Sequence, residues 1–239
     1  MKRTINNLLA KFNIRLIKLD KSNSLESFLL FLIKYKVNIN FVYDIGAYKG
    51  EWTNTVKKYL SNARFYLFEP NSIHNYELAK TNFPYFNLFL GESEKKITFW
   101  SANATGDTKY PEFNPILKPK SLQQVTLDYI VNKNNLPLPE FIKLDTQGSE
   151  LDILQGATHA IQDCKVMILE TPILKYNSGA PNQIDYLKFM KNIGMIPVWV
   201  TDIHRQKETA IQMDFAFFRM DLYEEKIGSI SNIPFWCQF

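Results

Sequence analysis

Short apolar runs alternate with amphipathic stretches along most of the chain, and this alternation predicts an α/β fold. The apolar runs are rich in Val, Ile, Leu, Phe and Tyr, which is typical of strands covered on both faces. They lie at residues 41–45, 64–68, 86–90, 141–144, 166–169, 195–200 and 214–218. Between them, apolar residues recur at helical spacing, as Leu151, Leu154 and Ala157 do. Such alternation predicts a mainly parallel sheet with helices around it, closed by a terminal pair of strands.

Shorter sequence features add three details to this predicted fold. Residues 96–100 are expected to form a short extra strand. Asp128 is expected to cap a short helix, because a side-chain carboxylate can accept from the free N–H groups of a first turn. A later helix is expected to bury one apolar face, made of Ile184, Leu187, Phe189 and Met190.

The first forty residues are predicted to form a helical cap. Residues 1–21 are basic and their leucines recur at helical spacing, which favours an amphipathic helix packed on the domain over a membrane-surface anchor. Ser24 is expected to cap a second helix that runs to Lys36. The apolar run Phe28–Ile33 has charged flanks and is too short to cross a bilayer, so we expect no membrane span.

The 239 residues are expected to form a single domain, with the cap at 1–40, the core at 41–219 and a tail at 220–239. The net charge of +4 permits an anionic partner without requiring one. Two cysteines, Cys164 and Cys237, provide neither a disulfide framework nor a metal cluster, so a cytoplasmic protein is expected. Residues 101–120 contain three prolines and little periodicity. We predict that they form a lid or an acceptor-recognition loop, with a disordered insertion as the alternative.

The glycine turn after the first predicted strand carries the first candidate chemistry. Gly46 can turn without a Cβ, and Gly50 lets the next helix pack near the strand. A dinucleotide site would place a glycine where Asp44 stands and would seat a pyrophosphate at the helix N-terminus. Asp44 and Glu51 would repel a pyrophosphate. They suit a phosphate-free ligand with a cationic end, and S-adenosylmethionine, with its sulfonium and ammonium groups, has that chemistry.

Acids also end the next two predicted strands. Glu69 is placed to accept hydrogen bonds from both ribose hydroxyls of a nucleoside, each worth about 1.5–3 kcal/mol. Glu92 follows the run at 86–90 and is expected to meet the adenine amino group, with an ordinary surface carboxylate as the alternative. The residues predicted to bind the cofactor are Asp44, Gly46, Ala47, Gly50, Glu69, Pro70 and Glu92.

Beside the glycine turn, three stretches carry a recognisable pattern. They are Phe68–Asn71, Val125–Asp128 and residues 142–157, and the last fits K-h-D-x-x-G-x-E-x-x-h-L-x-G-A, where h is apolar. With these motifs the chain resembles the FkbM family of S-adenosylmethionine-dependent methyltransferases from about residue 41 to residue 219. One departure is Thr146–Gln147, where many relatives carry an apolar residue and Glu; it bears on the acceptor side of the pocket.

The resemblance implies a class I methyltransferase (Rossmann-like) fold, with a sheet of about seven strands, helices on both faces and the last strand antiparallel. It also implies O-methyl transfer to a hydroxyl of a sugar, polysaccharide precursor or natural product. It leaves the identity of the acceptor open.

Asp145 and Glu170 end neighbouring predicted strands and are the candidates for the catalytic base. The acceptor hydroxyl must lose a proton during methyl transfer, and a placed base contributes roughly 10²–10⁴-fold. Asp145 is the first candidate, with a helix-capping role as the alternative. We expect no metal; the alternative is that Asp145, Glu170 and Asp214 hold a divalent ion that binds the acceptor. His204, expected in a loop between the last two strands, is the one histidine considered near the acceptor.

Other function classes compete with this interpretation. An NAD-dependent oxidoreductase is disfavoured by Asp44 and by the lack of a G-x-G-x-x-G run. A nucleic-acid methyltransferase gains slight support from the basic N-terminus, but the sequence has no proline–aromatic motif for a flipped base and no strongly basic stripe. A non-catalytic binding module that retains the fold is disfavoured by Glu69 and Asp145. We therefore expect a small-molecule or glycan acceptor.

Overall fold

The computed structural model describes residues 24–101, 110, 118–174 and 178–228. Three sequence predictions therefore lie wholly or mostly outside the described residues. They concern the helix expected within 1–21, the loop expected at 101–120, and the surroundings of Cys237. Among the described residues, none of the helices has the length and apolar character needed to cross a membrane.

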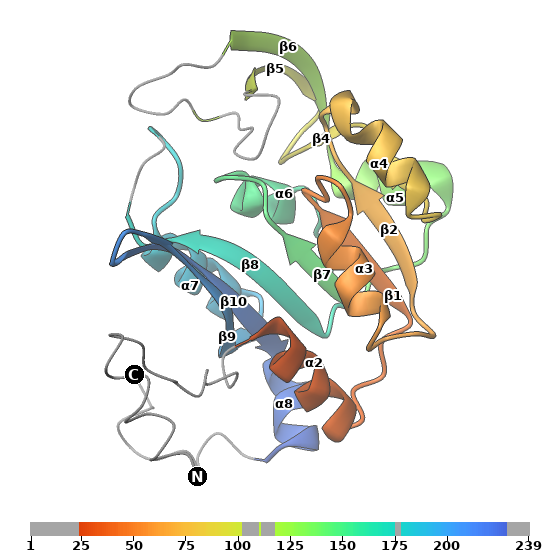
Figure 1. Ribbon diagram of the computed structural model, residues 1–239, viewed down its shortest axis with the longest axis vertical. Helices are drawn as coiled ribbons and strands as arrows, with labels where there is room; N and C mark the ends of the chain where they lie inside the picture. Colours follow the sequence, from red (N-terminus) through yellow and green to blue (C-terminus); the bar gives the residue numbers. More distant parts are fainter. Residues whose placement is uncertain (1–23, 102–109, 111–117, 175–177, 229–239) are drawn as a thin grey trace, which may run out of the picture.

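A seven-stranded sheet forms the centre of the protein, in the order β3-β2-β1-β7-β8-β10-β9 (Figure 1). Every neighbouring pair is parallel except those of β10, which runs antiparallel to both β8 and β9. The bounds are Phe41–Ile45 (β1), Arg64–Phe68 (β2), Tyr85–Phe86 (β3), Phe141–Leu144 (β7), Val166–Pro172 (β8), Met195–Gln206 (β9) and Thr209–Arg219 (β10). The expected seven-stranded α/β fold with an antiparallel last strand is confirmed.

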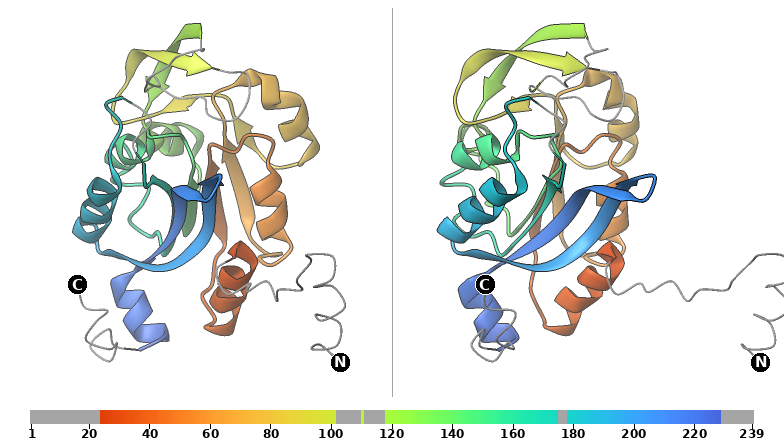
Figure 2. Two further views of the ribbon diagram at one scale, coloured as in Figure 1. Left: turned by 60° about the vertical axis from the view of Figure 1, so that its left-hand side comes forward. Right: turned by 90° about the vertical axis from the view of Figure 1, so that its left-hand side faces the viewer.

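Helices cover both faces of this sheet (Figures 1 and 2). One apolar core lies under α5 (Leu127–Asn134), α6 (Glu150–Gln155) and α7 (Gln183–Asn192). The other lies under α2 (Leu25–Lys34), α3 (Glu51–Lys57), α4 (Asn75–Lys80) and α8 (Met220–Lys226). Because strand residues alternate between faces, Val42 belongs to the second core and Tyr43 to the first. This two-sided burial explains why the strands read as continuous apolar runs.

The helix predicted to begin at Ser24 is confirmed as α2. The Ser24 hydroxyl accepts a hydrogen bond from the backbone N–H of Ser27. Asn71 accepts from the N–H of Ile73 in a short 3₁₀ turn, η2 (Ser72–His74), that precedes α4.

The single strand predicted at 86–90 is wrong, because the chain leaves the large sheet after Phe86. Asn87 donates its side-chain amide to the Glu69 carbonyl, which holds the chain at this exit. Phe89–Leu90 (β4) then pairs with Lys118–Val125 (β6), which also pairs with Lys95–Ser101 (β5), in a separate three-stranded sheet. Figure 2 shows this small sheet above the carboxyl ends of β1 and β2.

Two details of the predicted helices are also wrong. Thr126, not Asp128, caps α5, and the Asp128 carboxylate instead accepts from the N–H groups of His159 and Ala160. In α7 the buried residues are Tyr186 and Met190, whereas Ile184 is 61% exposed. Apolar character alone does not decide which helix residues face the core.

The final strands are longer than predicted, and this moves two candidate residues. β8 continues past Glu170 to Pro172, so Glu170 lies within a strand. β9 extends to Gln206, which places His204 on a strand and not in a loop. Asp214 lies in the middle of β10, directly opposite Glu170.

Candidate functional site

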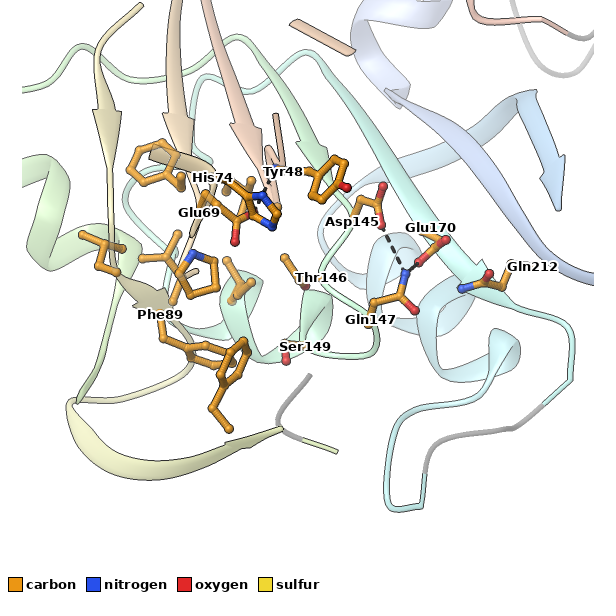
Figure 3. Close-up of a pocket in the computed structure, with 18 of the residues that line it drawn as sticks. Tyr48, Glu69, His74, Phe89, Asp145, Thr146, Gln147, Ser149, Glu170 and Gln212 are labelled. Carbon is orange, nitrogen blue, oxygen red and sulfur yellow. Dashed lines mark hydrogen bonds between the residues drawn. The ribbon is translucent and has the colours of Figure 1, made fainter. Parts of the chain in front are cut away.

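A pocket of about 390 Å³ opens at the carboxyl ends of the central parallel strands (Figure 3). One end is apolar, and its wall contains Phe68, Leu88, Phe89, Leu90 and Phe99. The other end is polar, and its wall contains Asp145, Gln147, Glu170, His204 and Gln212. Parallel α/β sheets generally bind ligands at this edge, so the topology and the pocket agree.

Gly46 forms the tight turn between these two ends. The φ of Gly46 is +79°, a left-handed conformation that glycine adopts without strain. The Gly46 N–H donates to the Phe68 carbonyl at 2.9 Å, and the Ala47 N–H donates to the same carbonyl at 3.1 Å. A Cβ on Gly46 would lie 1.9 Å from the Asp145 carbonyl oxygen, so only glycine fits between β1 and the end of β7.

Glu69 lines the pocket and is held from both sides. Its Oε2 accepts from the N–H of Tyr48 at 2.9 Å, and its Oε1 accepts from the N–H of Asn71 at 2.9 Å. The residue is only 6% exposed. Two backbone donors therefore fix the orientation of the Glu69 carboxylate in the pocket wall. Pro70 follows it in the pocket wall.

Four other predicted cofactor residues are outside the pocket wall. Ala47 is buried behind the turn, and Gly50 begins α3 with a φ of +76°. Asp44 is fully buried; it accepts from the Thr53 hydroxyl at 2.6 Å. Burial raises the pKa of Asp44, and the neighbouring Lys143 ammonium opposes that rise. Asp44 therefore acts on the pocket through the structure of the turn.

Glu92 is the fourth predicted cofactor residue outside the pocket wall, and its carboxylate contacts other side chains. It pairs with Lys95 and accepts from the Gln124 amide at 3.1 Å. The adenine contact predicted for Glu92 remains a prediction.

Asp145 is tied to a buried cation. Lys143 Nζ lies 3.0 Å from Asp145 Oδ2 and 3.7 Å from Asp44 Oδ1. Burial works against ionisation of Asp145, but the ammonium outweighs it and lowers the pKa of this carboxyl below its usual value. The lysine, for which sequence suggested no role, thus keeps Asp145 ionised.

The pKa of Glu170 is shifted in the opposite direction to that of Asp145. Burial, followed by the charges of Asp145, Glu150 and Asp214, raises the pKa of Glu170 well above its usual value. The carboxyls of Asp145 and Glu170 also hydrogen-bond each other. Asp145 is therefore the more acidic and Glu170 the less acidic carboxyl of this pair.

Gln147 bridges these two acids (Figure 3). Its Nε2 donates to Glu170 Oε2 at 2.6 Å and approaches Asp145 Oδ1 at 3.4 Å. Its φ is +54°, uncommon outside glycine. The loop is held in this shape by buried Glu150, which accepts from the N–H groups of Thr146 and Gly148. Residues 145–150 therefore hold a fixed conformation at the edge of the pocket. They belong to the motif at residues 142–157 on which the family resemblance rests.

Two histidines of the pocket wall, His74 and His204, were not among the predicted catalytic or cofactor-binding residues. His74 lies on η2, is 5% exposed and packs edge-to-face on Tyr48 with ring centroids 4.3 Å apart. His204 Nε2 lies 3.6 Å from Asp214 Oδ1, and this contact raises the pKa of the imidazole. A longer prediction of β9 would have identified His204; nothing in the sequence indicates that η2 turns His74 toward the pocket.

The strand order, the glycine turn without a pyrophosphate seat and the acid after β2 together define a class I S-adenosylmethionine-dependent methyltransferase. The chain belongs to the FkbM methyltransferase domain family, whose family model matches residues 44–222. S-adenosyl-L-methionine is its cofactor, as the sequence predicted.

The individual proteins that resemble this chain match it over a short stretch or at low sequence identity. A hexuronic acid methyltransferase of Haloferax volcanii is 32% identical over 50 residues, and this match spans 21% of each chain. Among solved structures, magnesium protoporphyrin IX methyltransferase from Synechocystis with bound S-adenosylmethionine shares 10% identity, covers 91% of this chain and 96% of its own, and has a TM-score of 0.47. A precorrin-6y C5,15-methyltransferase from Geobacter metallireducens shares 12% identity over 85% and 93% of the two chains, with a TM-score of 0.46. Likeness at this level carries no information about the acceptor.

Proposed function

We propose that the protein transfers the methyl group of S-adenosylmethionine to a hydroxyl of a sugar, a polysaccharide precursor or a natural product. The observation that carries this proposal is the polar end of the pocket. There, the carboxyls of Asp145 and Glu170 line the same space as the His204 imidazole and the Gln212 amide, and the four residues come from four different chain segments. Such a set of donors and acceptors suits a polyhydroxylated molecule.

The residues around Gly46 fit the cofactor. The tight turn gives a ligand access to backbone, the apolar wall suits an adenine ring, and Glu69 is oriented for ribose hydroxyls. Pro70 completes that wall. We assign Gly46, Glu69 and Pro70 to cofactor binding, with Asp44, Ala47 and Gly50 shaping the turn.

Bound S-adenosylmethionine supplies an electrophilic methyl group on a positively charged sulfur. We assign the base role to Asp145. As the oxygen–methyl bond forms and the methyl–sulfur bond breaks, the hydroxyl proton becomes strongly acidic, so even a carboxylate of low pKa accepts it. Lys143 keeps Asp145 ionised, and Glu170, bridged through Gln147, positions it. Alignment of the reacting atoms can supply about 7–11 kcal/mol of the barrier reduction.

The carboxyl groups at the polar end of the pocket argue against a nucleic-acid acceptor. Asp145, Asp202 and Asp214 gather at the acceptor end, where their carboxyl groups would repel a phosphate backbone. The relative named above, which acts on a hexuronic acid, supports an oxygen-rich acceptor. The cytoplasmic location and the single-domain organisation expected from sequence belong to this proposal as well.

The test is a transfer assay with methyl-labelled S-adenosylmethionine and a panel of monosaccharides, uronic acids, sugar nucleotides and transfer RNA. We expect label in a saccharide, and we expect it to survive mild alkali, because a methyl ether does so and a methyl ester of a uronic acid does not. Label confined to RNA, or released by alkali, would contradict hydroxyl methylation.

A further inference from the structure

We propose that Glu170, His204 and Asp214 form a binding site for one divalent transition-metal ion at the acceptor end of the pocket. The ligand set follows from strand geometry; the role of the ion as an acceptor-binding centre rests on the proposed function. This departs from the sequence expectation that no metal is bound.

The three residues come from three adjacent strands. Glu170 lies on β8, Asp214 on β10 and His204 on β9. Asp214 pairs with Glu170 on one side, and His204 pairs with Gln212, two residues before Asp214, on the other. Residues opposite each other in antiparallel strands, and residues two apart in one strand, project from the same face. The backbone ladder therefore brings all three side chains together.

The distances suit an ion better than direct contact. His204 Nε2 lies 3.6 Å from Asp214 Oδ1 and 4.0 Å from Glu170 Oε1, and one donor atom from each of the three residues lies within 4.8 Å of the others. Both measured separations are too long for a good hydrogen bond. They are within the limit of about 4.4 Å for two ligands that each lie about 2.2 Å from one ion.

An independent observation concerns Asp214. Its Oδ1 is completely buried and has no hydrogen-bond donor among the described residues. This same oxygen faces the His204 imidazole. A buried carboxylate oxygen without a partner is costly. A cation between Oδ1 and the imidazole would satisfy it.

The charged groups around these three residues also favour a bound cation. Four carboxyl groups gather here, those of Asp145, Glu170, Asp202 and Asp214. The nearby ammonium of Lys143 is engaged with Asp44 and Asp145. That engagement also explains why Asp145, considered for a metal from sequence, is replaced as a ligand by His204.

One imidazole and two carboxylates are ligands that suit Mn²⁺, Fe²⁺ or Zn²⁺. Glu170 and His204 line the pocket, so an ion held by three protein ligands would have its open coordination positions on that side. An acceptor hydroxyl bound there would lose its proton more readily. An acceptor with a second oxygen beside the reacting hydroxyl, such as a vicinal diol or a hydroxy acid, would bind best.

The test is a titration of chelator-treated, metal-free protein with Mn²⁺, followed by the electron paramagnetic resonance signal of the free ion. We expect one saturable site per chain. His204→Gln and Asp214→Asn should each weaken Mn²⁺ binding at least about tenfold. His159→Gln is the matched control, because His159 is an exposed histidine on another segment. It should bind Mn²⁺ within about threefold of wild type.

Absence of a saturable site in the wild-type protein would overturn the proposal, and so would wild-type affinity in His204→Gln. If Asp214→Asn fails to fold by circular dichroism, His204→Gln decides alone, because its half-exposed side chain tolerates replacement. No acceptor is present in this titration. A negative result therefore leaves the proposed function untouched, whereas failure to methylate saccharides with Mn²⁺ present leaves the ion site untouched.

Discussion

Replacing Gly46 by alanine probes the close approach of the first turn to the end of β7. Gly46 has a φ of +79°, and Gly194, at the end of α7, has a φ of +74°. Alanine meets nearly the same backbone penalty at both positions. The surroundings differ: a Cβ at Gly46 lies 1.9 Å from the Asp145 carbonyl oxygen, whereas a Cβ at Gly194 has no neighbour within 4 Å. The pair separates backbone strain from crowding.

The expected magnitudes follow from this difference. A left-handed conformation costs a residue with a Cβ about 1–2 kcal/mol, so Gly194→Ala should lower the free energy of unfolding by about that amount. Gly46→Ala incurs the same cost and also displaces the turn from β7. Overpacking adds about 1–3 kcal/mol, which gives a total loss of about 2–5 kcal/mol. The displaced turn should also weaken S-adenosylmethionine binding at least tenfold, which corresponds to about 1.4 kcal/mol.

Urea unfolding gives the stabilities and titration calorimetry gives the cofactor affinities of both variants. We expect Gly194→Ala to bind the cofactor as wild type does. Equal stability losses in the two variants, or an unchanged cofactor affinity in Gly46→Ala, would refute the close approach of β1 and β7.

The other predictions concern charged residues of the site. Glu69→Ala should weaken cofactor affinity at least tenfold, about 1.4 kcal/mol, by calorimetry; unchanged affinity would mean that the end of β2 does not contact the ligand. Asp145→Asn should bind the cofactor normally but slow transfer to an identified acceptor about 10²-fold or more, and full activity would remove it from the base role. Lys143→Met should cost about 3–5 kcal/mol in urea unfolding, since it leaves buried carboxylates without their cation; a loss below about 1 kcal/mol would contradict this. Folded Glu170 holds its proton to higher pH than the unfolded chain does, so its contribution to stability is fully present below its ordinary pKa of about 4.3 and is lost as pH rises toward the folded-state value. With chelator present, the stability of Glu170→Gln relative to wild type should therefore increase from about pH 4.5 to about pH 8 in thermal melts, and parallel curves would contradict the raised pKa.

The fold could be predicted in outline because strand burial dominates this sequence. β1 and β2 match their predicted bounds residue for residue, since both are apolar runs bounded by polar turns. The run at 86–90 was equally apolar, yet it divides between two sheets. The division depends on the Asn87 hydrogen bond to the Glu69 carbonyl, a contact distant in sequence that no local pattern encodes.

The candidate site could be predicted where a motif fixes the backbone. Gly46, Glu69 and Asp145 all line the pocket, as expected from their places after parallel strands. The sequence predicts a loop at His204 because the exposed halves of β9 and β10 carry mixed polar residues, and these segments become strands only by pairing with each other. The ionisation of Asp145 could not be predicted either, since it depends on a lysine that packs beneath it.

A crystal structure of the protein with S-adenosylhomocysteine would show directly whether the cofactor binds beside Gly46. We expect the adenosine to lie against Phe68 and Leu90, the ribose hydroxyls to bind Glu69, and the sulfur to be open toward Asp145. A ligand bound elsewhere, or a pocket beside Gly46 that stays closed by side chains at saturating ligand, would contradict this expectation.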